Sequence, residues 1–347
     1  MKVLMITPRV DMEHDIFGFI HSWVDELSKR VDSLEVVTFG VGKTKLGDNV
    51  NLYSAYSKYQ PVKFLKLNKF LLSLTPRVDV VFTHMYPWLP IAAAPYAKVF
   101  GKPLVMFNAH GHVDFKKKLA AALVDRVVTS SDRGFNIDTP KKVVIGQGID
   151  TERFKPSNNE KGKDVFRILA VGRIDKIKGY DIVIDALNVI INIKRRYNIR
   201  LKIVGPIYDN NYFIFLKDKI SKFSLKDYIT FEGHVPYKRL HIYYQQCDLF
   251  ANPSYASSLE KTVLEAMACG KPVITSNIAY YSDVFDAELR EKCFFEAGNY
   301  KELASKIEYF IENDDIKLKK KLRKIVVKDH SIKNFAKNLV KVFESVR

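Results

Sequence analysis

The sequence predicts an α/β protein built from two doubly wound parallel sheets, and three observations lead to that prediction. Short, continuous apolar segments recur along the chain, as parallel strands with both faces covered require. Helical patterns of apolar residues alternate with these segments. A polar stretch at Lys155–Asp164 interrupts the alternation, which then begins again. With 347 residues, the chain is long enough for two domains of ordinary size.

The first half of the chain carries the first series of elements. We expect strands at Val3–Thr7, Leu34–Phe39, Val78–Thr83, Leu104–Asn108, Val127–Ser130 and Val143–Ile145. Phe17–Arg30 places its apolar residues on one side of a helix. The expected N-terminal domain therefore covers residues 1–153, and a linker follows over 154–164.

The second series forms an expected domain over residues 165–328. Its strands are predicted at Phe166–Val171, Leu201–Val204, Ile229–Glu232, Leu249–Asn252 and Val273–Ser276. Its helices are predicted at Tyr180–Arg196, Asn211–Phe223, Tyr237–Gln246, Thr262–Ala268 and Lys301–Asn313. A last helix over Ser331–Val346 has one apolar side that needs a partner surface. In open α/β sheets, ligands bind outside the carboxyl ends of the strands.

Composition narrows the class of protein. Apolar residues make up 47% and charged residues 27%, which is typical of a soluble globular chain. The N-terminal MKVLMITPRVD reads as a strand and not as a secretory signal, so we expect a cytoplasmic protein. Cys247, Cys269 and Cys293 are odd in number and lack C-x-x-C spacing. They predict three reduced, buried thiols and neither disulfides nor a zinc site.

The formal net charge of +17 is shared by both halves of the chain. Residues 1–150 hold 20 basic and 14 acidic side chains, and the remainder holds 36 and 25. Such a field attracts nucleotides, anionic lipid surfaces and nucleic acid alike. Net charge alone does not choose among these partners.

The segment Arg167–Leu187 contains the strongest chemical pattern. A strand is followed by Gly172, which allows a tight turn, and then by Arg173, Lys178 and Gly179 at the mouth of a helix. Two cations at a strand-to-helix turn suit a diphosphate, because arginine binds two oxygens and lysine acts as a point charge. The alternative is an ordinary surface turn with solvated charges.

A second pattern lies in Asn252–Asn277. A strand ends at Asn-Pro-Ser, a polar loop follows, and a short helix carries Glu265 among small apolar residues. Backbone N–H groups at the start of that helix favour an anionic or hydroxyl-rich ligand. The Glu265 carboxylate can accept both hydroxyls of a ribose. The alternative is a buried glutamate bonded by backbone donors.

Together these segments are similar to the retaining glycosyltransferases of the GT-B fold, glycosyltransferase family 4. The resemblance rests on VGR-x4-KG, a later Val-Gly, and PS-x9-LEAMACGKPV. VIGQGIDTERFKP resembles the domain junction of that family, and NAHGHVD resembles its His-Gly segment. This family resemblance implies two Rossmann-like domains that face each other across a cleft. It also implies that the last helix (329–347) packs back toward the N-terminal domain. It also implies a hexosyltransferase, EC class 2.4, that uses a nucleotide-diphosphate sugar such as a UDP- or GDP-sugar.

The resemblance also implies roles for individual residues. Arg173 and Lys178 would bind the diphosphate and stabilise the leaving group, and Glu265 would bind the ribose. Gly18 would let backbone approach the phosphates, and His110 would lie beside the transferred sugar. The implied catalytic residues are thus His110, Arg173 and Lys178. The implied donor-binding residues are Gly18, Gly172, Arg173, Lys178, Ser257, Ser258, Leu259, Glu260 and Glu265. The sequence has no Asp-x-Asp pair, so neither a metal nor a cofactor is expected.

One departure from the family pattern concerns the donor sugar. The family usually has a glutamate eight residues before the ribose-binding one, and here that position is Ser257. Either Ser257 and nearby backbone groups replace this glutamate, or Glu260 reaches in from a rearranged loop. His110 also has a simpler alternative, which is a turn residue hydrogen-bonded to backbone. His84 and His112 gain nothing from the resemblance.

The segment Lys58–Leu74 predicts a helix with a basic stripe at Lys63, Lys66 and Lys69 beside apolar residues such as Phe64 and Phe70. Such a helix suits an anionic membrane interface. The alternative is a crossover helix with solvated lysines. The expected acceptor is a saccharide. If this helix meets a membrane, the acceptor would be a lipid-linked saccharide and the protein would be peripheral on the inner face of the membrane.

Other functions remain open from the sequence. A nucleotide-sugar-binding or nucleic-acid-binding protein with impaired or absent transferase activity is the main alternative, because of Ser257 and the positive charge. Nucleic acid is the less expected partner, since the basic residues lack interleaved exposed aromatics. A DNA-modifying sugar transferase is a further alternative, and its affinity for DNA would fall steeply with salt.

Overall fold

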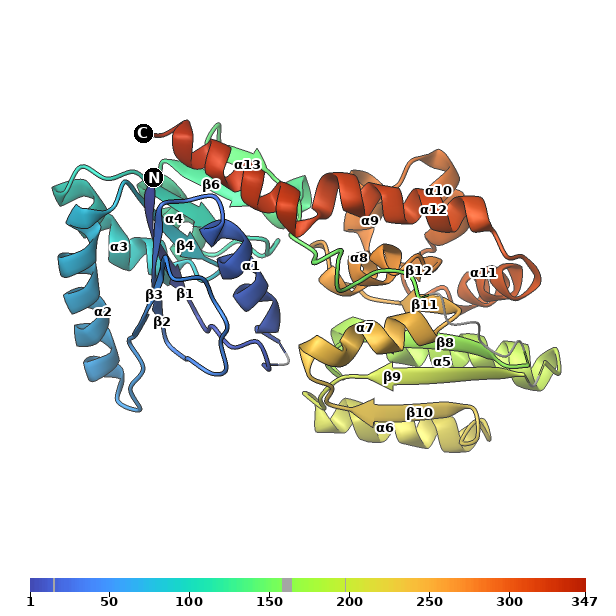
Figure 1. Ribbon diagram of the computed structural model, residues 1–347. Coiled ribbons are helices and arrows are strands. Elements are labelled where there is room, and N and C mark those ends of the chain that lie inside the picture. Colours follow the sequence, from blue (N-terminus) through green and yellow to red (C-terminus); the bar gives the residue numbers. More distant parts are fainter. Residues whose placement is uncertain (15, 158–163, 197) are drawn as a thin grey trace. The chain divides into compact units, whose positions relative to one another are not determined.

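A computed structural model describes residues 1–14, 16–157, 164–196 and 198–347 (Figure 1). These residues form two compact units, Met1–Asp150 with Asp329–Arg347, and Thr151–Lys328. Each unit is built around one parallel sheet, so the predicted α/β class with two doubly wound sheets is confirmed. Residues 158–163 of the predicted linker lie outside the described residues.

The sheet of the first unit has the strand order β3-β2-β1-β4-β5-β6-β7, and all neighbouring strands are parallel. The strands are β1 (Lys2–Thr7), β2 (Ser33–Thr38), β3 (Val50–Ser54), β4 (Val80–His84), β5 (Leu104–Phe107), β6 (Arg126–Thr129) and β7 (Lys142–Val144). Strand β1 is buried on both faces because Val3 and Met5 enter one core while Leu4 and Ile6 enter the other. This double burial explains the continuous apolar run in the sequence.

Helices cover both faces of this sheet. Helices α2 (Gln60–Leu74), α3 (Trp88–Val99) and α4 (Phe115–Leu123) share one core with the sheet, and α1 (Gly18–Ser28) and α13 (Ile332–Glu344) share the other. Figure 1 shows α1 on the opposite side of the strands from α2 and α3. The rings of Trp23 in α1 and Phe335 in α13 have centroids 4.0 Å apart. The last helix of the chain is therefore part of the core of the first unit.

A short backbone bridge joins the two places where the chain leaves and re-enters the first unit. The Ile149 N–H donates to the His330 carbonyl at 2.7 Å, and the Ile332 N–H donates to the Ile149 carbonyl at 2.7 Å. Gly148 lies next to this bridge with a positive φ of 69°. A Cβ at Gly148 would lie 2.6 Å from the indole nitrogen of Trp23, so glycine alone lets the strand pass this close to α1.

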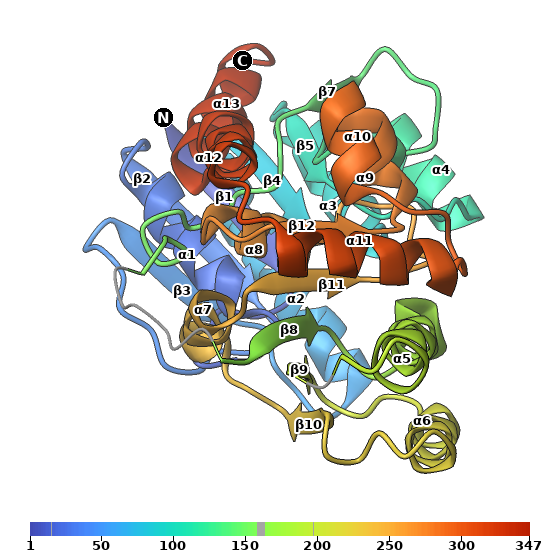
Figure 2. The same cartoon turned by 90° about the vertical axis from the view of Figure 1, so that its right-hand side faces the viewer.

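The sheet of the second unit has the order β10-β9-β8-β11-β12 and is also parallel. Its strands are β8 (Phe166–Val171), β9 (Ile199–Val204), β10 (Ile229–Gly233), β11 (Leu249–Asn252) and β12 (Val273–Thr275). Its helices are α5 (Tyr180–Asn188), α6 (Asn210–Lys222), α7 (Tyr237–Gln246), α8 (Lys261–Ala268), α9 (Ile278–Asp283), α10 (Ala287–Cys293), α11 (Tyr300–Glu312) and α12 (Ile316–Ile325). Figure 2 shows this sheet nearly end-on, with α5 and α6 on one face and α7 on the other.

Some elements differ from those predicted. Strand β3 was not predicted because none of its residues is fully buried, so it lacks a continuous apolar run. The helix predicted over 180–196 ends as an α-helix at Asn188 and continues as a π-helical turn over Val189–Ile193. The β-branched run Val189-Ile190-Ile191 lowers the helix propensity at that point.

The cysteines match the prediction, since Cys247, Cys269 and Cys293 are all buried and free. Among the described residues, no helix has the length and apolarity that crossing a bilayer requires.

Candidate functional site

The carboxyl ends of β8 and β9 approach each other through two glycines. Both strands end in Val-Gly, and Gly172 and Gly205 have positive φ values of 155° and 152°. A Cβ at Gly205 would lie 2.0 Å from the carbonyl oxygen of Gly172. Since no side chain fits in that space, the two Val-Gly turns pack backbone against backbone. This edge is where an open α/β sheet binds its ligand.

The turn after β8 carries the first predicted cation. The Arg173 Nε donates to Asp175 Oδ2 at 3.0 Å, and its guanidinium lies 4.7 Å from the centroid of the Tyr208 ring. Tyr208 follows β9, and its backbone N–H donates to the Ile174 carbonyl at 3.1 Å. The two turns therefore hold Arg173 between a carboxylate and an aromatic face. Its side chain stays 46% exposed, so its remaining N–H groups can reach a ligand.

Gly179 ends the same turn and brings it against the loop after β11. It has a φ of 62°, and a Cβ there would lie 2.0 Å from the carbonyl oxygen of Pro253. The Tyr255 N–H donates to the Ile177 carbonyl at 2.9 Å across the same contact. The two sequence patterns that the analysis singled out, 167–187 and 252–277, thus meet at one edge of the sheet.

Lys178 and Glu260 form an ion pair at this contact. Their side chains are only 17% and 10% exposed. The second oxygen of Glu260 accepts from the Asn277 side-chain amide at 3.2 Å, and the Ser254 side chain also bonds the carboxylate. Burial alone would raise the pKa of Glu260, but the Lys178 ammonium and these hydrogen bonds hold that pKa below its ordinary value. Glu260 is therefore an ionised carboxylate held in the candidate site.

Ser257 and Glu260, which the sequence left as alternatives, differ in where their side chains lie. The side chain of Ser257 is exposed, whereas that of Glu260 points inward to Lys178. Ser258 accepts from the Asn277 amide through its backbone carbonyl at 2.9 Å, and Leu259 is buried. The loop is thus arranged around Glu260.

Glu265 lies deeper, on α8, and is 2% exposed. The Tyr244 hydroxyl donates to its Oε2 at 2.9 Å, and the Tyr237 hydroxyl also bonds the carboxylate. Burial raises the pKa of Glu265 to about 7. Its partners are tyrosine side chains from α7 and not the backbone donors considered from the sequence.

The predicted residues of the first unit lie on different elements of that unit. Gly18 is buried at the start of α1. His110 follows β5, and its Nδ1 accepts from the His112 N–H at 3.3 Å. His84 is fully buried, with Nδ1 3.1 Å from the Thr7 hydroxyl. The backbone contact of His110 corresponds to the turn conformation considered as an alternative, although the side chain is exposed.

A residue that the sequence analysis missed supports the His110 loop. Lys117 is 2% exposed, and its ammonium donates to the His110 carbonyl and, at 3.2 Å, to the His112 carbonyl. It also lies 4.5 Å from the centroid of the Phe135 ring. Burial lowers its pKa to about 8. The only sequence signal was its place in a run of three lysines, which gives no indication that the central one is buried.

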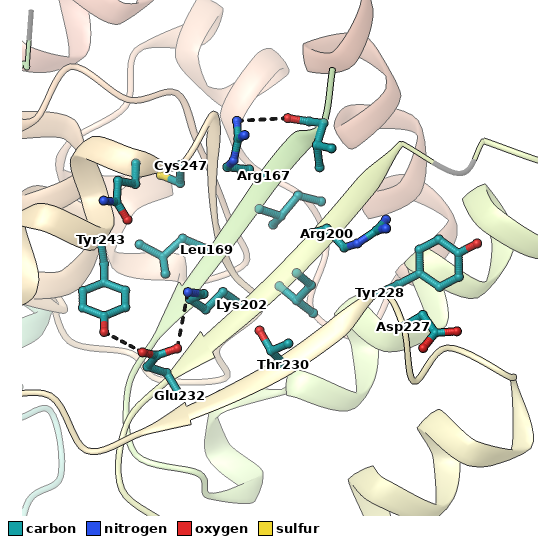
Figure 3. Close-up of a pocket in the computed structure, with 14 residues that line it drawn as sticks. Arg167, Leu169, Arg200, Lys202, Asp227, Tyr228, Thr230, Glu232, Tyr243 and Cys247 are labelled. Carbon is teal, nitrogen blue, oxygen red and sulfur yellow. Dashed lines mark hydrogen bonds and ion pairs between the residues drawn. The ribbon is translucent and has the colours of Figure 1, made fainter. Parts of the chain in front are cut away.

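The second unit also has a groove of about 720 Å³ over one face of β8, β9 and β10 (Figure 3). Its charged side chains are largely paired with one another. Glu232 accepts from the Tyr243 hydroxyl at 2.7 Å and lies 3.3 Å from the Lys202 ammonium. Arg167 lies 3.8 Å from Asp248. Because these side chains already satisfy one another, and Lys202 with Glu232 is an ordinary cross-strand pair, the groove is a weaker candidate than the carboxyl edge.

The described residues contain no group of three or more His, Cys, Asp or Glu side chains placed to hold a metal ion. Arg173 and Lys178 are cations at the carboxyl edge that can meet negative charge.

Comparison with known proteins identifies relatives of the second unit. The family described as glycosyl transferases group 1 matches residues 150–330, which is more than half of the chain. A D-inositol 3-phosphate glycosyltransferase of Paenarthrobacter aurescens is 27% identical over 172 residues, 46% of this chain and 41% of the relative. The lipopolysaccharide core biosynthesis mannosyltransferase LpsB of Rhizobium meliloti is 26% identical over 185 residues, 50% of this chain and 51% of the relative. The chain thus spans about half the length of these curated relatives.

Solved structures extend the likeness over both units. HepE from Anabaena, crystallised with UDP and glucose, has a TM-score of 0.77 and 18% identity, and the alignment covers 99% of this chain and 100% of HepE. At this identity the likeness concerns the fold, which is the GT-B arrangement of two Rossmann-like domains.

Proposed function

Because the chain belongs to the glycosyl transferases group 1 family, we propose that it transfers a sugar from a nucleotide-diphosphate sugar to a hydroxyl of a saccharide acceptor. One observation carries the proposal. Arg173 and the ion pair between Lys178 and Glu260 lie on the loops at the carboxyl edge of the second sheet, inside the family match, where glycines bring three loops together. We further propose that the enzyme belongs to glycosyltransferase family 4 and retains the configuration of the anomeric carbon.

In the proposed reaction, the bond between the sugar and the diphosphate breaks and negative charge develops on the leaving diphosphate. Arg173 and Lys178 stabilise that charge, since preorganised cations act most strongly on charge that forms in the transition state. Glu265 binds the ribose. Glu260 takes the place of the usual glutamate at position 257 and accepts hydroxyls of the donor sugar. Gly18 and His110 contribute from the first unit, with His110 beside the transferred sugar.

The donor is proposed to be a UDP- or GDP-sugar. HepE was crystallised with UDP and glucose, and LpsB is named as a mannosyltransferase. A panel of UDP- and GDP-sugars, scored by thermal stabilisation and by donor hydrolysis, tests this. A donor at about 100 times its dissociation constant should stabilise its unit by about 2.7 kcal/mol. If no nucleotide sugar in the panel stabilises the protein or is hydrolysed, the proposal is wrong.

We also propose that the reaction needs no metal ion, because Arg173 and Lys178 supply the positive charge. The test is donor turnover in excess EDTA. Turnover should equal that in untreated enzyme. Loss of turnover that Mg²⁺ or Mn²⁺ restores would contradict the proposal.

The acceptor is proposed to be a saccharide, including one linked to lipid and presented at an anionic membrane surface. In that case the enzyme works in the cytoplasm and attaches reversibly to the inner face of the membrane. Turnover with a lipid-linked acceptor in vesicles should exceed that with the same saccharide free in solution.

A further inference from the structure

The outer face of α2 exposes apolar side chains that a soluble helix normally buries. Leu67, Leu71 and Leu74 form its inner stripe and are buried against the sheet. On the outside, Phe64 is 57% exposed and Leu65 is 67% exposed. Val62, Leu72 and the preceding Tyr59 are also exposed. Single exposed apolar residues are ordinary, but several large ones on one helix make its outer face a candidate interaction surface.

The charges around this face are of one sign. From Asn49 to Val78 the chain has no Asp or Glu, but it has four lysines and one arginine. Lys58, Lys66 and Lys69 are exposed. Lys63 is partly buried instead, with its ammonium 4.8 Å from the centroid of the Phe39 ring, so the three-lysine stripe at 63, 66 and 69 is only partly available. The apolar residues therefore matter more to this surface than the sequence indicated.

The start of α4 extends the same composition. In a parallel sheet with crossover helices, α2, α3 and α4 all begin at the carboxyl edge of the strands. These helices are neighbours in one layer, because α2 contacts α3 and α3 contacts α4. Phe115, the first residue of α4, is 78% exposed and is followed by the exposed Lys116 and Lys118. The layer thus carries exposed aromatic and basic residues at both its first and last helix.

We propose that the outer face of α2, together with Phe115, docks the first unit on an anionic membrane. Lysines without neighbouring acids attract anionic headgroups, and the apolar side chains between them enter the boundary with the acyl chains. Such a surface would bind a protein partner less well, because protein interfaces are depleted in lysine. The inference rests on the proposed function only in placing the membrane on the acceptor side.

The test is co-sedimentation of the full chain with vesicles of phosphatidylcholine alone and of phosphatidylcholine mixed with phosphatidylglycerol. Wild type should bind the anionic vesicles and bind less in high salt. The double variant Phe64→Ser/Leu65→Ser should lower the partition coefficient about tenfold or more, because each lost side chain removes buried apolar area. The matched control is Ile214→Ser/Phe215→Ser on α6, where the two side chains are 56% and 49% exposed. It should bind as wild type does.

A second pair of variants separates local charge from the overall charge of +17. Lys58→Gln/Lys66→Gln/Lys69→Gln should weaken binding, while Lys317→Gln/Lys320→Gln/Lys324→Gln should not. The control residues are exposed lysines of α12 in the second unit. Equal loss in the two triple variants would mean that only net charge acts, and would overturn the proposal.

Two other results would also overturn it. One is no binding of wild type to anionic vesicles at low salt. The other is a wild-type dimer that Phe64→Ser/Leu65→Ser converts to a monomer without affecting vesicle binding. Hydrolysis of a soluble nucleotide sugar should be the same in all four variants, so the docking surface can fail while the proposed transferase stands. If wild type hydrolyses no nucleotide sugar, that result counts against the proposed transferase and not against the docking surface.

Discussion

The candidate site is nearly charge-balanced before any ligand binds. Arg173 is paired with Asp175, and Lys178 is paired with Glu260. A diphosphate must therefore compete with carboxylates for both cations. Arginine can bond a carboxylate and a phosphate at once through its several N–H groups, whereas the Lys178 ammonium must share its donors with Glu260. The two cations are thus expected to respond differently to substitution.

The first prediction concerns these cations. Arg173→Ala and Lys178→Ala should each lower kcat/KM by roughly 10²–10³, since each removes one stabilising group for the leaving charge. Lys176→Ala is the control, because Lys176 is an exposed lysine on the same turn. The far-UV circular dichroism of all three variants should match that of wild type. If both Arg173→Ala and Lys178→Ala turn over donor at the wild-type rate, these two residues do not bind the diphosphate.

The second prediction concerns Glu260→Gln. The amide keeps the size of the side chain but releases Lys178 from its ion pair. Binding of the nucleoside diphosphate alone should become tighter, while turnover of the complete donor should fall because a carboxylate that accepts sugar hydroxyls is lost. Calorimetry and donor turnover measure the two effects. Glu312→Gln on the exposed end of α11 is the control. If both quantities stay at wild-type values, Glu260 has no part in donor binding.

For single residues, the sequence indicated which residue types belong to the candidate site, but it did not indicate which side chains contact each other. Ser257 could be recognised as a departure because its position follows from spacing alone. The inward turn of Glu260 depends on Asn277 and Ser254, which lie at either side of it in the chain. Lys117 was missed for a similar reason. Its burial is set by Phe135 and by two backbone carbonyls, and no local pattern encodes these contacts.

Among the elements, α13 has the clearest energetic role. Its apolar stripe packs on α1, and Phe335 also lies 5.6 Å from the Phe107 ring of β5. Phe335→Ala should destabilise the first unit by about 3–5 kcal/mol, which is typical when a buried aromatic side chain is removed. Denaturant unfolding followed by tryptophan fluorescence measures this, because the Trp23 ring contacts Phe335. Lys337→Ala, on the exposed side of α13, should have little effect.

The elements that the sequence predicted are those with strong periodicity or full burial. Tyr237–Gln246 was predicted with its observed bounds, and Ile332–Glu344 was predicted within two residues at each end. The short helices α9 and α10 were missed because six or seven residues carry too little periodic pattern. Helix α12 was missed because its many lysines leave only Leu318 and Leu322 buried.

For the molecule as a whole, His330 in the first unit and Glu265 in the second should contribute to the pH dependence of stability with opposite signs. Burial lowers the pKa of His330, in the first unit, from 6.5 to about 4. The unfolded state then binds a proton that the folded state does not, so this unit loses stability as pH falls from about 6.5 to 4. Burial raises the pKa of Glu265, in the second unit, from 4.5 to about 7. Its contribution to stability is present at low pH and is lost as pH rises from 4.5 through 7.

The tryptophans allow this prediction to be tested. Trp23 and Trp88 are the two tryptophans of the chain, and both belong to the first unit. Denaturant midpoints from tryptophan fluorescence should fall on acidification, and they should fall less in His330→Gln than in wild type. His112→Gln, with an exposed ring, is the control. An identical acid dependence in wild type and His330→Gln would contradict the assignment.

The sequence predicted the fold class of the whole molecule because each half repeats the same alternation of buried strands and helices. It could not give the strand order, which depends on crossovers between distant segments such as β1 and β4. The division of the chain was also only partly visible. A boundary near residue 150 follows from the polar stretch. The return of residues 329–347 to the first unit was implied only by the family resemblance, because packing against α1 is not encoded in a local pattern.

That discontinuity affects how the protein is made. A ribosome delivers β1 to β7 first, yet α13, which covers one face of their sheet together with α1, is encoded beyond Lys328. At ~5–20 residues per second, synthesis of Thr151–Lys328 takes roughly 10–40 s. During that interval the second unit can fold, while the first unit still lacks α13 and the Trp23 side of α1 stays exposed to water. We therefore expect the second unit to complete its fold before the first, the reverse of their order in the chain.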